Sequence, residues 1–145
     1  MLQNPFFENE QDTSAMKKRI IACDDATCIT RSISMKLTKG GYDVQTAING
    51  RDALELIRKS VPDLLISDCQ MPYMDGLELI QALREEPATQ DLPVIMLTAK
   101  GFELDHEFLQ SKLKITQVVS KPFSPRELLK LVDSILAKQT ETAVG

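Results

Sequence analysis

The sequence predicts an α/β protein in which helices cover both faces of a parallel sheet, as a doubly wound three-layer sandwich. Two observations indicate this class. Short β-rich runs alternate with helical patterns five times between residues 19 and 138. The β-rich runs are mostly continuous apolar segments, such as LLI and VIML, which is typical of strands covered on both faces.

Each predicted strand is followed directly by a predicted helix. The β-rich runs read RIIAC, DVQTA, DLLIS, PVIMLT and TQVVS along the chain. The resulting five βα units are strand 19–23 with helix 27–39, strand 43–47 with helix 51–60, strand 63–67 with helix 77–85, strand 93–98 with helix 102–112, and strand 116–120 with helix 125–138.

The predicted helices have apolar stripes and recognisable first turns. In the first helix Ile29, Ile33 and Leu37 recur every four residues, so one face of it is apolar. Ser124 precedes a proline and then a glutamate three residues on, which is the pattern of a capped helix start. Asp75 occupies the same capping position before the third helix.

The length and composition predict one domain. With 145 residues, 43% of them hydrophobic and 26% charged, the chain can close one core but is short for two. We assign this domain to residues 17–138. Residues 1–16 and 139–145 show no useful periodicity, and we expect them to form flexible tails.

The charge and cysteine content exclude several functional classes. A net charge of -4 disfavours direct nucleic-acid binding, which requires clustered Lys and Arg. Cys23, Cys28 and Cys69 form no CxxC pair, so they indicate neither a disulfide framework nor a complete zinc site. No run has the length of a signal peptide or a membrane span. We therefore expect a cytoplasmic protein with no membrane contact.

Polar side chains follow four of the five predicted strands. Asp24 and Asp25 follow the first strand, Asp68 the third, Thr98 ends the fourth, and Lys121 follows the fifth. The carboxyl ends of parallel strands meet at one edge of a sheet, where ligands bind in such folds. We therefore expect three carboxylates, a hydroxyl and an ammonium group to converge there.

This set of side chains predicts a magnesium site that accepts a phosphoryl group. Crowded carboxylates repel one another unless a cation lies among them. Mg²⁺ takes oxygen ligands, usually one or two carboxylates, and leaves other positions to water and phosphate oxygens. An aspartate can attack phosphorus to form an acyl phosphate, and Lys121 and Thr98 can stabilise the transferred group.

Four motifs in order resemble the receiver domains of two-component response regulators. They are IIACDD, DCQMPYMDG, VIMLTAK and VVSKPF, and the likeness extends over residues 17–138. The resemblance implies a flavodoxin-like, five-stranded parallel sheet of order 2-1-3-4-5 with five helices. It also implies a stand-alone receiver that receives a phosphoryl group and changes its binding to a partner protein.

The resemblance assigns roles at the metal and the acceptor. Asp68 is similar in position to the phosphoacceptor, which also contacts the metal. Asp24 and Asp25 match the acid pair that binds Mg²⁺. Gln70, two residues after the acceptor, matches the position whose backbone carbonyl binds the same ion.

The resemblance also assigns roles around the phosphoryl group. Thr98 matches the switch threonine, and Lys121 matches the lysine that pairs with the phosphoryl group. The bond between Lys121 and Pro122 is expected to be cis. Gln70 and Lys100, by the same analogy, influence the lifetime of the acyl phosphate.

One position departs from the family pattern. Receivers commonly carry a tyrosine or phenylalanine three residues before the lysine, whereas this chain has Val118. The usual coupling between threonine and aromatic side chain is therefore absent in that form. Phosphorylation itself does not depend on it.

The expected partners are a sensor histidine kinase or histidine phosphotransfer protein and an output protein that the sequence does not identify. We expect a monomer or a phosphorylation-dependent dimer, with no direct contact to nucleic acid. We expect a switch protein and no enzyme.

Several alternatives remain open from the sequence. Asp25 could act only as the cap of the first helix. The chain could be a Mg²⁺-dependent phosphatase of the haloacid-dehalogenase kind, although Gln70 stands where those enzymes place a second acid. It could also be an interaction module that is not phosphorylated, or a phosphate sink without an output partner.

Overall fold

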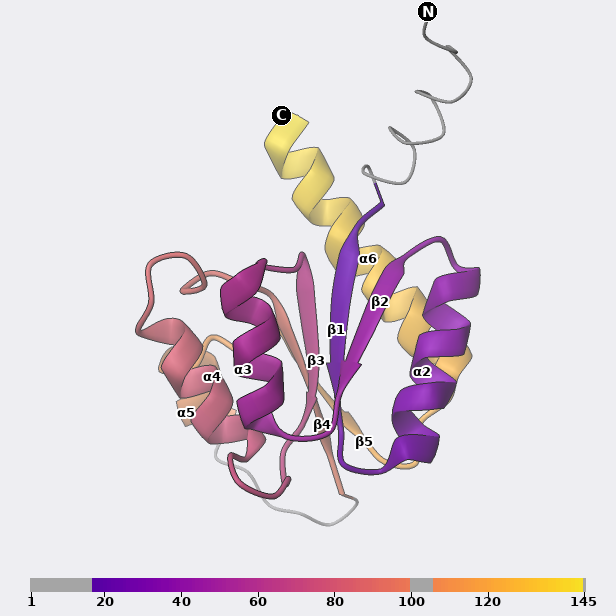
Figure 1. Cartoon of the computed structure of the whole chain (residues 1–145). Helices are drawn as coiled ribbons and strands as arrows, with labels where there is room; N and C mark the ends of the chain where they lie inside the picture. Colours follow the sequence, from indigo (N-terminus) through magenta and orange to yellow (C-terminus); the bar gives the residue numbers. More distant parts are fainter. Residues whose placement is uncertain (1–16, 100–105, 145) are drawn as a thin grey trace, which may run out of the picture.

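The computed structural model describes residues 17–99 and 106–144, which form one parallel sheet with helices on both faces (Figure 1). The strand order is β2-β1-β3-β4-β5. The strands are β1 (Arg19–Cys23), β2 (Asp43–Ala47), β3 (Leu64–Asp68), β4 (Val94–Thr98) and β5 (Gln117–Ser120). The helices are α2 (Thr27–Lys39), α3 (Gly50–Lys59), α4 (Gly76–Arg84), α5 (His106–Ser111) and α6 (Pro125–Val144). The predicted flavodoxin-like fold is confirmed.

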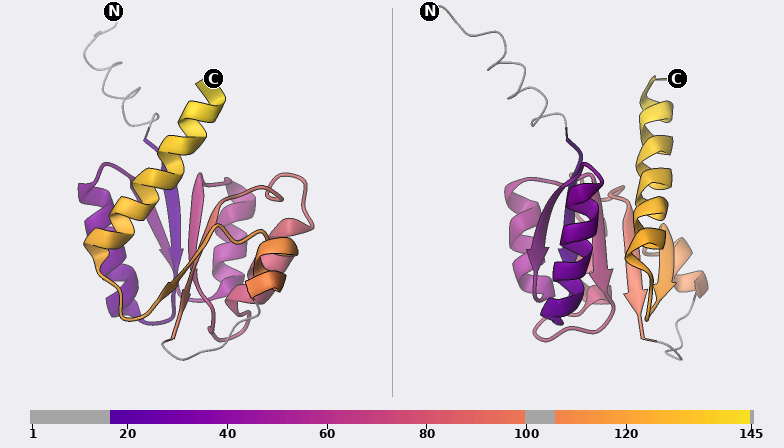
Figure 2. Two further views of the ribbon diagram at one scale, coloured as in Figure 1. Left: turned by 180° about the vertical axis from the view of Figure 1, so that it is seen from behind. Right: turned by 90° about the vertical axis from the view of Figure 1, so that its right-hand side faces the viewer.

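The core is divided by the sheet into two layers of apolar side chains. Figures 1 and 2 show α2 and α6 on one face, and α3, α4 and α5 on the other. Ile33 of α2 and Val132 of α6 pack with Ile20 and Ile66 in one buried cluster. The opposite cluster contains residues of α3, α4 and α5 together with the alternate residues of the strands. The two-sided burial explains why the strands are continuous apolar runs.

The burial differs between the middle of the sheet and its margins. Every residue of β3 and β4 is buried, whereas β2 and β5 are largely exposed or half-buried. The strands β3 and β4 therefore form the most enclosed part of the sheet. Their last residues, Asp68 and Thr98, are polar side chains that this enclosure keeps away from water.

The predicted starts of two helices are confirmed. Asp75 caps α4 by accepting the N–H of Glu78 at 2.8 Å, and the Glu78 carboxylate accepts the N–H of Asp75 at 3.1 Å. Ser124 accepts the N–H of Glu127 through its hydroxyl oxygen at 3.3 Å, so α6 begins at Pro125. These caps fix the points at which the chain leaves the strand ends.

The predicted C-terminal tail 139–145 is wrong over most of its length. Helix α6 continues beyond residue 138 to Val144, and Gly145 lies outside the described residues. Residues 139–144 include good helix formers and contain neither proline nor glycine, so nothing in this segment ends the helix. The predicted tail 1–16 and the start of the predicted helix 102–112 also lie outside the described residues.

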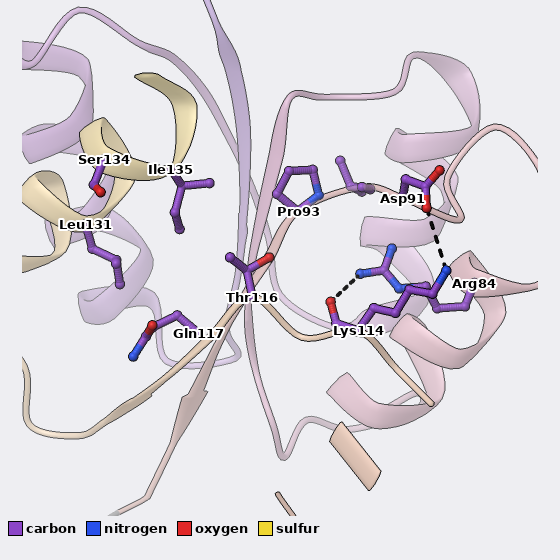
Figure 3. A pocket seen from close by; sticks show the side chains of 10 residues that line it. Arg84, Asp91, Pro93, Lys114, Thr116, Gln117, Leu131, Ser134 and Ile135 are labelled. Carbon is purple, nitrogen blue, oxygen red and sulfur yellow. Dashed lines mark hydrogen bonds and ion pairs between the residues drawn. The ribbon is translucent and has the colours of Figure 1, made fainter. Parts of the chain in front are cut away.

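A cavity of about 470 Å³ opens at the edge of the sheet where the strands begin. Figure 3 shows its wall of Leu131 and Ile135 from α6 on one side and the basic residues Arg84 and Lys114 on the other. Thr116, just before β5, lies between them. None of the three acids singled out in the sequence lines this cavity.

The helices in the described ranges do not combine the length and the apolar character that crossing a membrane requires.

Candidate functional site

The three acids meet at the edge of the sheet where the strands end. Asp68 is the last residue of β3, and Asp24 and Asp25 follow β1, the neighbouring strand. One carboxylate oxygen from each lies within 4.8 Å of the others. Asp24 and Asp68 are buried, at 1% and 7% exposure, while Asp25 is exposed. The sheet thus holds two buried carboxylates and one exposed carboxylate at a single point.

Lys121 bridges the two buried acids. Its Nζ lies 2.8 Å from Oδ2 of Asp24 and 3.2 Å from Oδ1 of Asp68. The backbone holds this residue firmly, since Lys121 donates its N–H to the carbonyl of Thr98 at 2.7 Å. The peptide bond between Lys121 and Pro122 is cis, as predicted. One ammonium group therefore faces both carboxylates.

The two carboxylate oxygens of Asp24 have different partners. Oδ1 accepts the N–H of Ala26 at 2.9 Å. Oδ2 is fully buried and accepts no hydrogen bond of good geometry from the described residues, although the ammonium of Lys121 lies at 2.8 Å. A buried carboxylate oxygen has lost its water shell, and here one ammonium group, shared with Asp68, replaces that shell only in part. An oxygen in this condition is well suited to a cation.

Asp68 is held through one of its two carboxylate oxygens. Oδ1 accepts the N–H of Cys69 at 2.9 Å and pairs with Lys121. Burial and the negative charge of Asp24 raise the pKa of Asp68, and Lys121 offsets part of this rise. Burial lowers the pKa of Lys121, but its contacts with Asp24 and Asp68 outweigh that effect and raise the pKa. The ammonium of Lys121 is thereby favoured.

Asp25 is not a helix cap. The N-cap of α2 is Ala26, which has no polar side chain, and its N–H is donated to Oδ1 of Asp24 and not to Asp25. The interpretation of Asp25 as only a cap is therefore wrong. Its carboxylate instead lies beside Asp24 and Asp68.

Thr98 and Gln70 flank the acids on two sides. Thr98 ends β4 next to β3 and is 3% exposed. Gln70 lies in the exposed loop directly after Asp68 and Cys69. Its backbone carbonyl accepts no hydrogen bond from any described residue, whereas the Cys69 carbonyl accepts the N–H of Gly76 at 2.9 Å. Lys100, the other expected lifetime position, lies outside the described residues.

Two glycines support the site, and the sequence interpretation missed both. A Cβ on Gly76 would lie 2.1 Å from the carbonyl oxygen of Asp68, and a Cβ on Gly50 would lie 2.4 Å from that of Met74. Each contact brings backbone against backbone, so no side chain fits. A glycine at the first position of a helix is an available signal, because it costs helix stability and requires a steric reason.

Val118 lies beside a cavity. Its side chain is half-buried against the core cluster that contains Leu109 and Ile115. A cavity of about 170 Å³ is lined by these three residues together with Gln110, Thr116 and Gln117. The position that carries an aromatic ring in the family pattern thus has open space around the smaller valine.

The donor set fits Mg²⁺. Three carboxylates that converge within 4.8 Å supply hard oxygen ligands, and none of the three cysteines contributes to the cluster. Oδ2 of Asp24, whose one partner is the shared Lys121 ammonium, and the open carbonyl of Gln70 add to this fit. A magnesium ion would also offset the negative charge that the single ammonium of Lys121 leaves uncompensated.

Comparison with curated proteins relates the chain to transcriptional regulators. The response regulator receiver domain family model matches residues 20–133. The chain is 40% identical over 131 residues to the "Probable transcriptional regulator ycf27" of Pyropia yezoensis, covering 89% of this chain and 52% of that protein. It is 37% identical over 123 residues to the alkaline phosphatase synthesis transcriptional regulatory protein PhoP of Bacillus subtilis, covering 85% and 50%. The chain spans about half the length of these relatives.

Solved structures of receivers are similar over nearly their full length. The chemotaxis response regulator CheY4 of Vibrio cholerae aligns with a TM-score of 0.75 at 32% identity, covering 83% of this chain and 99% of that chain. The receiver domain of the Francisella response regulator 1452 aligns with a TM-score of 0.74 at 32% identity, covering 86% and 99%.

The family model extends over most of the domain, and the strand order agrees with the fold that the four motifs imply. The acids, the threonine and the lysine lie where those motifs end their strands. The chain belongs to the response regulator receiver domain family of two-component signalling.

Proposed function

We propose that the chain is a phosphorylation-dependent switch in which Asp68 accepts a phosphoryl group from a phosphohistidine in the presence of Mg²⁺. The donor is a sensor histidine kinase or a histidine phosphotransfer protein. The observation that carries this proposal is the ammonium of Lys121 between Asp24 and Asp68, at 2.8 and 3.2 Å. It provides a positive charge directly beside the carboxylate that would carry the phosphoryl group.

Mg²⁺ would be held by the carboxylates of Asp24, Asp25 and Asp68 and by the backbone carbonyl of Gln70. When bound, it supplies positive charge to the oxygens of the phosphoryl group. The buried Oδ2 of Asp24, which has only the shared Lys121 ammonium as a partner, and the 4.8 Å cluster of carboxylates support this assignment.

The residues of the chain divide the transfer between them. Oδ1 of Asp68 is occupied by the N–H of Cys69 and by Lys121, so Oδ2 is the oxygen we expect to attack phosphorus. The new bond joins Oδ2 to phosphorus as the bond from phosphorus to the histidine nitrogen breaks, and its electron pair stays on that nitrogen. Lys121 then pairs with the phosphoryl group, and the Thr98 hydroxyl donates to one of its oxygens.

The product is the modified protein itself, so the chain acts as a switch and not as a turnover enzyme. Contacts of Thr98 and Lys121 with the phosphoryl group would favour one arrangement of the loops after β4 and β5. An output partner then binds one arrangement better than the other. Two relatives that are about twice as long are named as transcriptional regulators, which supports transcription as a process that such a switch controls.

The remaining expectations follow from the composition. The net charge of -4 supports a chain that does not itself contact nucleic acid. Cys23, Cys28 and Cys69 are free thiols, which supports the cytoplasm as the place of action. A monomer or a phosphorylation-dependent dimer agrees with a switch of this kind.

The test is phosphorylation by acetyl phosphate with Mg²⁺, followed by mass spectrometry to locate the added phosphoryl group. We expect one phosphoryl group on Asp68, no modification in EDTA, and none in Asp68→Asn. Asp91→Asn is the matched control, because Asp91 is an exposed aspartate remote from the three acids. Failure of both acetyl phosphate and phosphohistidine donors to modify Asp68 would overturn the proposal.

Two further outcomes would redirect the function. Catalytic turnover of small phosphate esters that disappears in Asp68→Asn would indicate a phosphatase. A modified Asp68 without any change in partner binding would indicate a phosphate sink.

A further inference from the structure

The loop of residues 69–75, which follows the acceptor and contains Gln70, is held from outside by the turn before α3. We call this loop the metal loop. Gly50, the first residue of α3, donates its N–H to the carbonyl of Met74 at 3.0 Å. At the end of the loop, Gly76 donates its N–H to the carbonyl of Cys69 at 2.9 Å. The loop is therefore tied to a second segment of the chain as well as to itself.

Two side-chain contacts join the same turn to the same loop. Sγ of Cys23 lies 3.2 Å from the carbonyl oxygen of Asn49 and 3.2 Å from Sδ of Met71. On the outer surface, the guanidinium of Arg51 lies 5.3 Å from the centre of the Tyr73 ring. A buried thiol thus contacts both segments, and an exposed cation beside Gly50 contacts the metal loop.

The contact at Gly50 leaves no room for adjustment. A Cβ at this position would lie 2.4 Å from the Met74 carbonyl oxygen, far closer than two such atoms approach. Tyr73, next to Met74, has a φ of 68°, a left-handed conformation that a tyrosine adopts only when its surroundings impose it. The turn therefore fixes the backbone of the metal loop to within a narrow range of positions.

The position of the loop matters because the carbonyl of Gln70 in it is open. The carbonyls of Cys69 and Met74 are used by Gly76 and Gly50, whereas that of Gln70 accepts no hydrogen bond from the described residues. Mg²⁺ requires near-ideal octahedral geometry and tolerates small displacements of its ligands poorly. A shift of the metal loop would move the Gln70 carbonyl relative to the carboxylates.

We propose that Gly50 and Arg51 are positioning residues that set the Mg²⁺ affinity of the site by holding the metal loop. Neither residue contacts the ion in this account. They act through the Met74 carbonyl and the Tyr73 ring, and so through the Gln70 carbonyl. The proposal rests on the proposed Mg²⁺-dependent function and extends it to residues outside the acid cluster.

The test measures Mg²⁺ binding to the unmodified protein by isothermal titration calorimetry in Gly50→Ala and Arg51→Ala. We expect Gly50→Ala to raise the Kd for Mg²⁺ about tenfold, as is typical when a supporting contact of a metal ligand is removed. Arg51→Ala removes only the exposed contact and should raise the Kd about twofold. Gly41→Ala is the control, since it strains a left-handed glycine (φ 99°) at the other end of the β-strand that precedes the turn.

A second readout separates positioning from loss of stability. We expect the Mg²⁺ concentration for half-maximal phosphorylation by acetyl phosphate to rise in both variants, with the rate at saturating Mg²⁺ nearly unchanged. A purely structural effect would appear equally in Gly41→Ala and would not change the Mg²⁺ dependence. If Gly50→Ala does not fold, Arg51→Ala decides the question alone.

If the parent binds Mg²⁺ and the folded variants bind it with the same Kd, this inference is overturned and the proposed function stays intact. A parent that binds no Mg²⁺ would overturn both.

Discussion

The edge of the sheet where the strands end and the edge where they begin carry different kinds of ion pair, one buried and one exposed. Where the strands end, Lys121 pairs with Asp24 and Asp68, whose side chains are 1% and 9% exposed. Where the strands begin, Lys114 and Asp91 pair at 3.7 Å with side chains 60% and 81% exposed. An exposed pair contributes little to stability, whereas buried acids cost free energy unless they are fully compensated. The difference indicates that the buried acids are retained for binding and chemistry.

The largest expected difference between the two edges is in the stability lost when a glycine is replaced by alanine. Gly76→Ala should destabilise the protein by about 3 kcal/mol, because the new Cβ would meet the Asp68 carbonyl oxygen and the backbone would have to move. Gly40 lies at the opposite edge, at the end of α2, where a Cβ would meet mainly the flexible end of Leu129. Gly40→Ala should therefore cost less, about 1 kcal/mol. Urea denaturation measures both, and equal losses would remove the distinction.

The second prediction concerns the lysines. Lys121→Met leaves two buried carboxylates without their shared partner, so it should lower the stability of the metal-free protein by about 2 kcal/mol. Lys114→Met should cost less than about 0.5 kcal/mol, because both partners are exposed. Denaturation in EDTA compares them. A loss in Lys114→Met as large as that in Lys121→Met would contradict the account of the two edges.

The third prediction concerns pH. Burial and Asp24 raise the pKa of Asp68 above its ordinary 3.8 in the folded state. The folded protein therefore holds this proton more tightly than the unfolded chain, and the associated stability is lost as the pH rises through the raised pKa. We expect Asp68→Asn, which does not ionise, to gain stability relative to the parent as the pH rises above about 4.

This pH effect should be smaller than that of Lys121→Met, since Lys121 already offsets part of the pKa rise. Denaturation curves of both proteins in EDTA at several pH values measure it. Mg²⁺ is the internal control, because a bound cation favours the ionised carboxylate and should reduce the difference. If the parent instead becomes more stable relative to Asp68→Asn as the pH rises in EDTA, the predicted direction of the pH effect is wrong.

The smallest effect is expected at Val118, which lies within β5 between the start and the end of the strand. Val118→Tyr should change the stability by less than about 1 kcal/mol, because the cavity of about 170 Å³ beside it can take part of the ring. Replacing a fully enclosed valine such as Val94, which begins β4, should cost more. A large loss in Val118→Tyr would show that the cavity cannot accommodate the family's usual aromatic side chain.

The sequence predicted the strands well because their burial leaves a clear pattern. The fully buried β3 and β4 are apolar runs whose polar last residues, Asp68 and Thr98, identified the functional edge. The strand order required the resemblance to receivers, since periodicity does not determine which strands are neighbours. The end of α6 was missed because no residue before Gly145 marks a stop.

The supporting contacts of the site could not be predicted in the same way. Gly50 and Met74 lie in different βα units, and their contact depends on how two connections pack at the edge of the sheet. Asp25 was ambiguous because an acid before a helix resembles a cap, and only the backbone geometry of Ala26 excluded that role. Sequence patterns thus located the reactive side chains but not the backbone contacts that hold them.

Phosphotransfer from a phosphorylated histidine kinase is the most direct test of Asp68 as a Mg²⁺-dependent phosphoacceptor. The parent chain, Asp68→Asn and Asp91→Asn are each mixed with a panel of labelled kinases, with Mg²⁺ and with EDTA. We expect label to pass from at least one kinase to the parent and to Asp91→Asn only with Mg²⁺, and never to Asp68→Asn. Label on Asp68→Asn, or equal transfer in EDTA, would contradict this expectation.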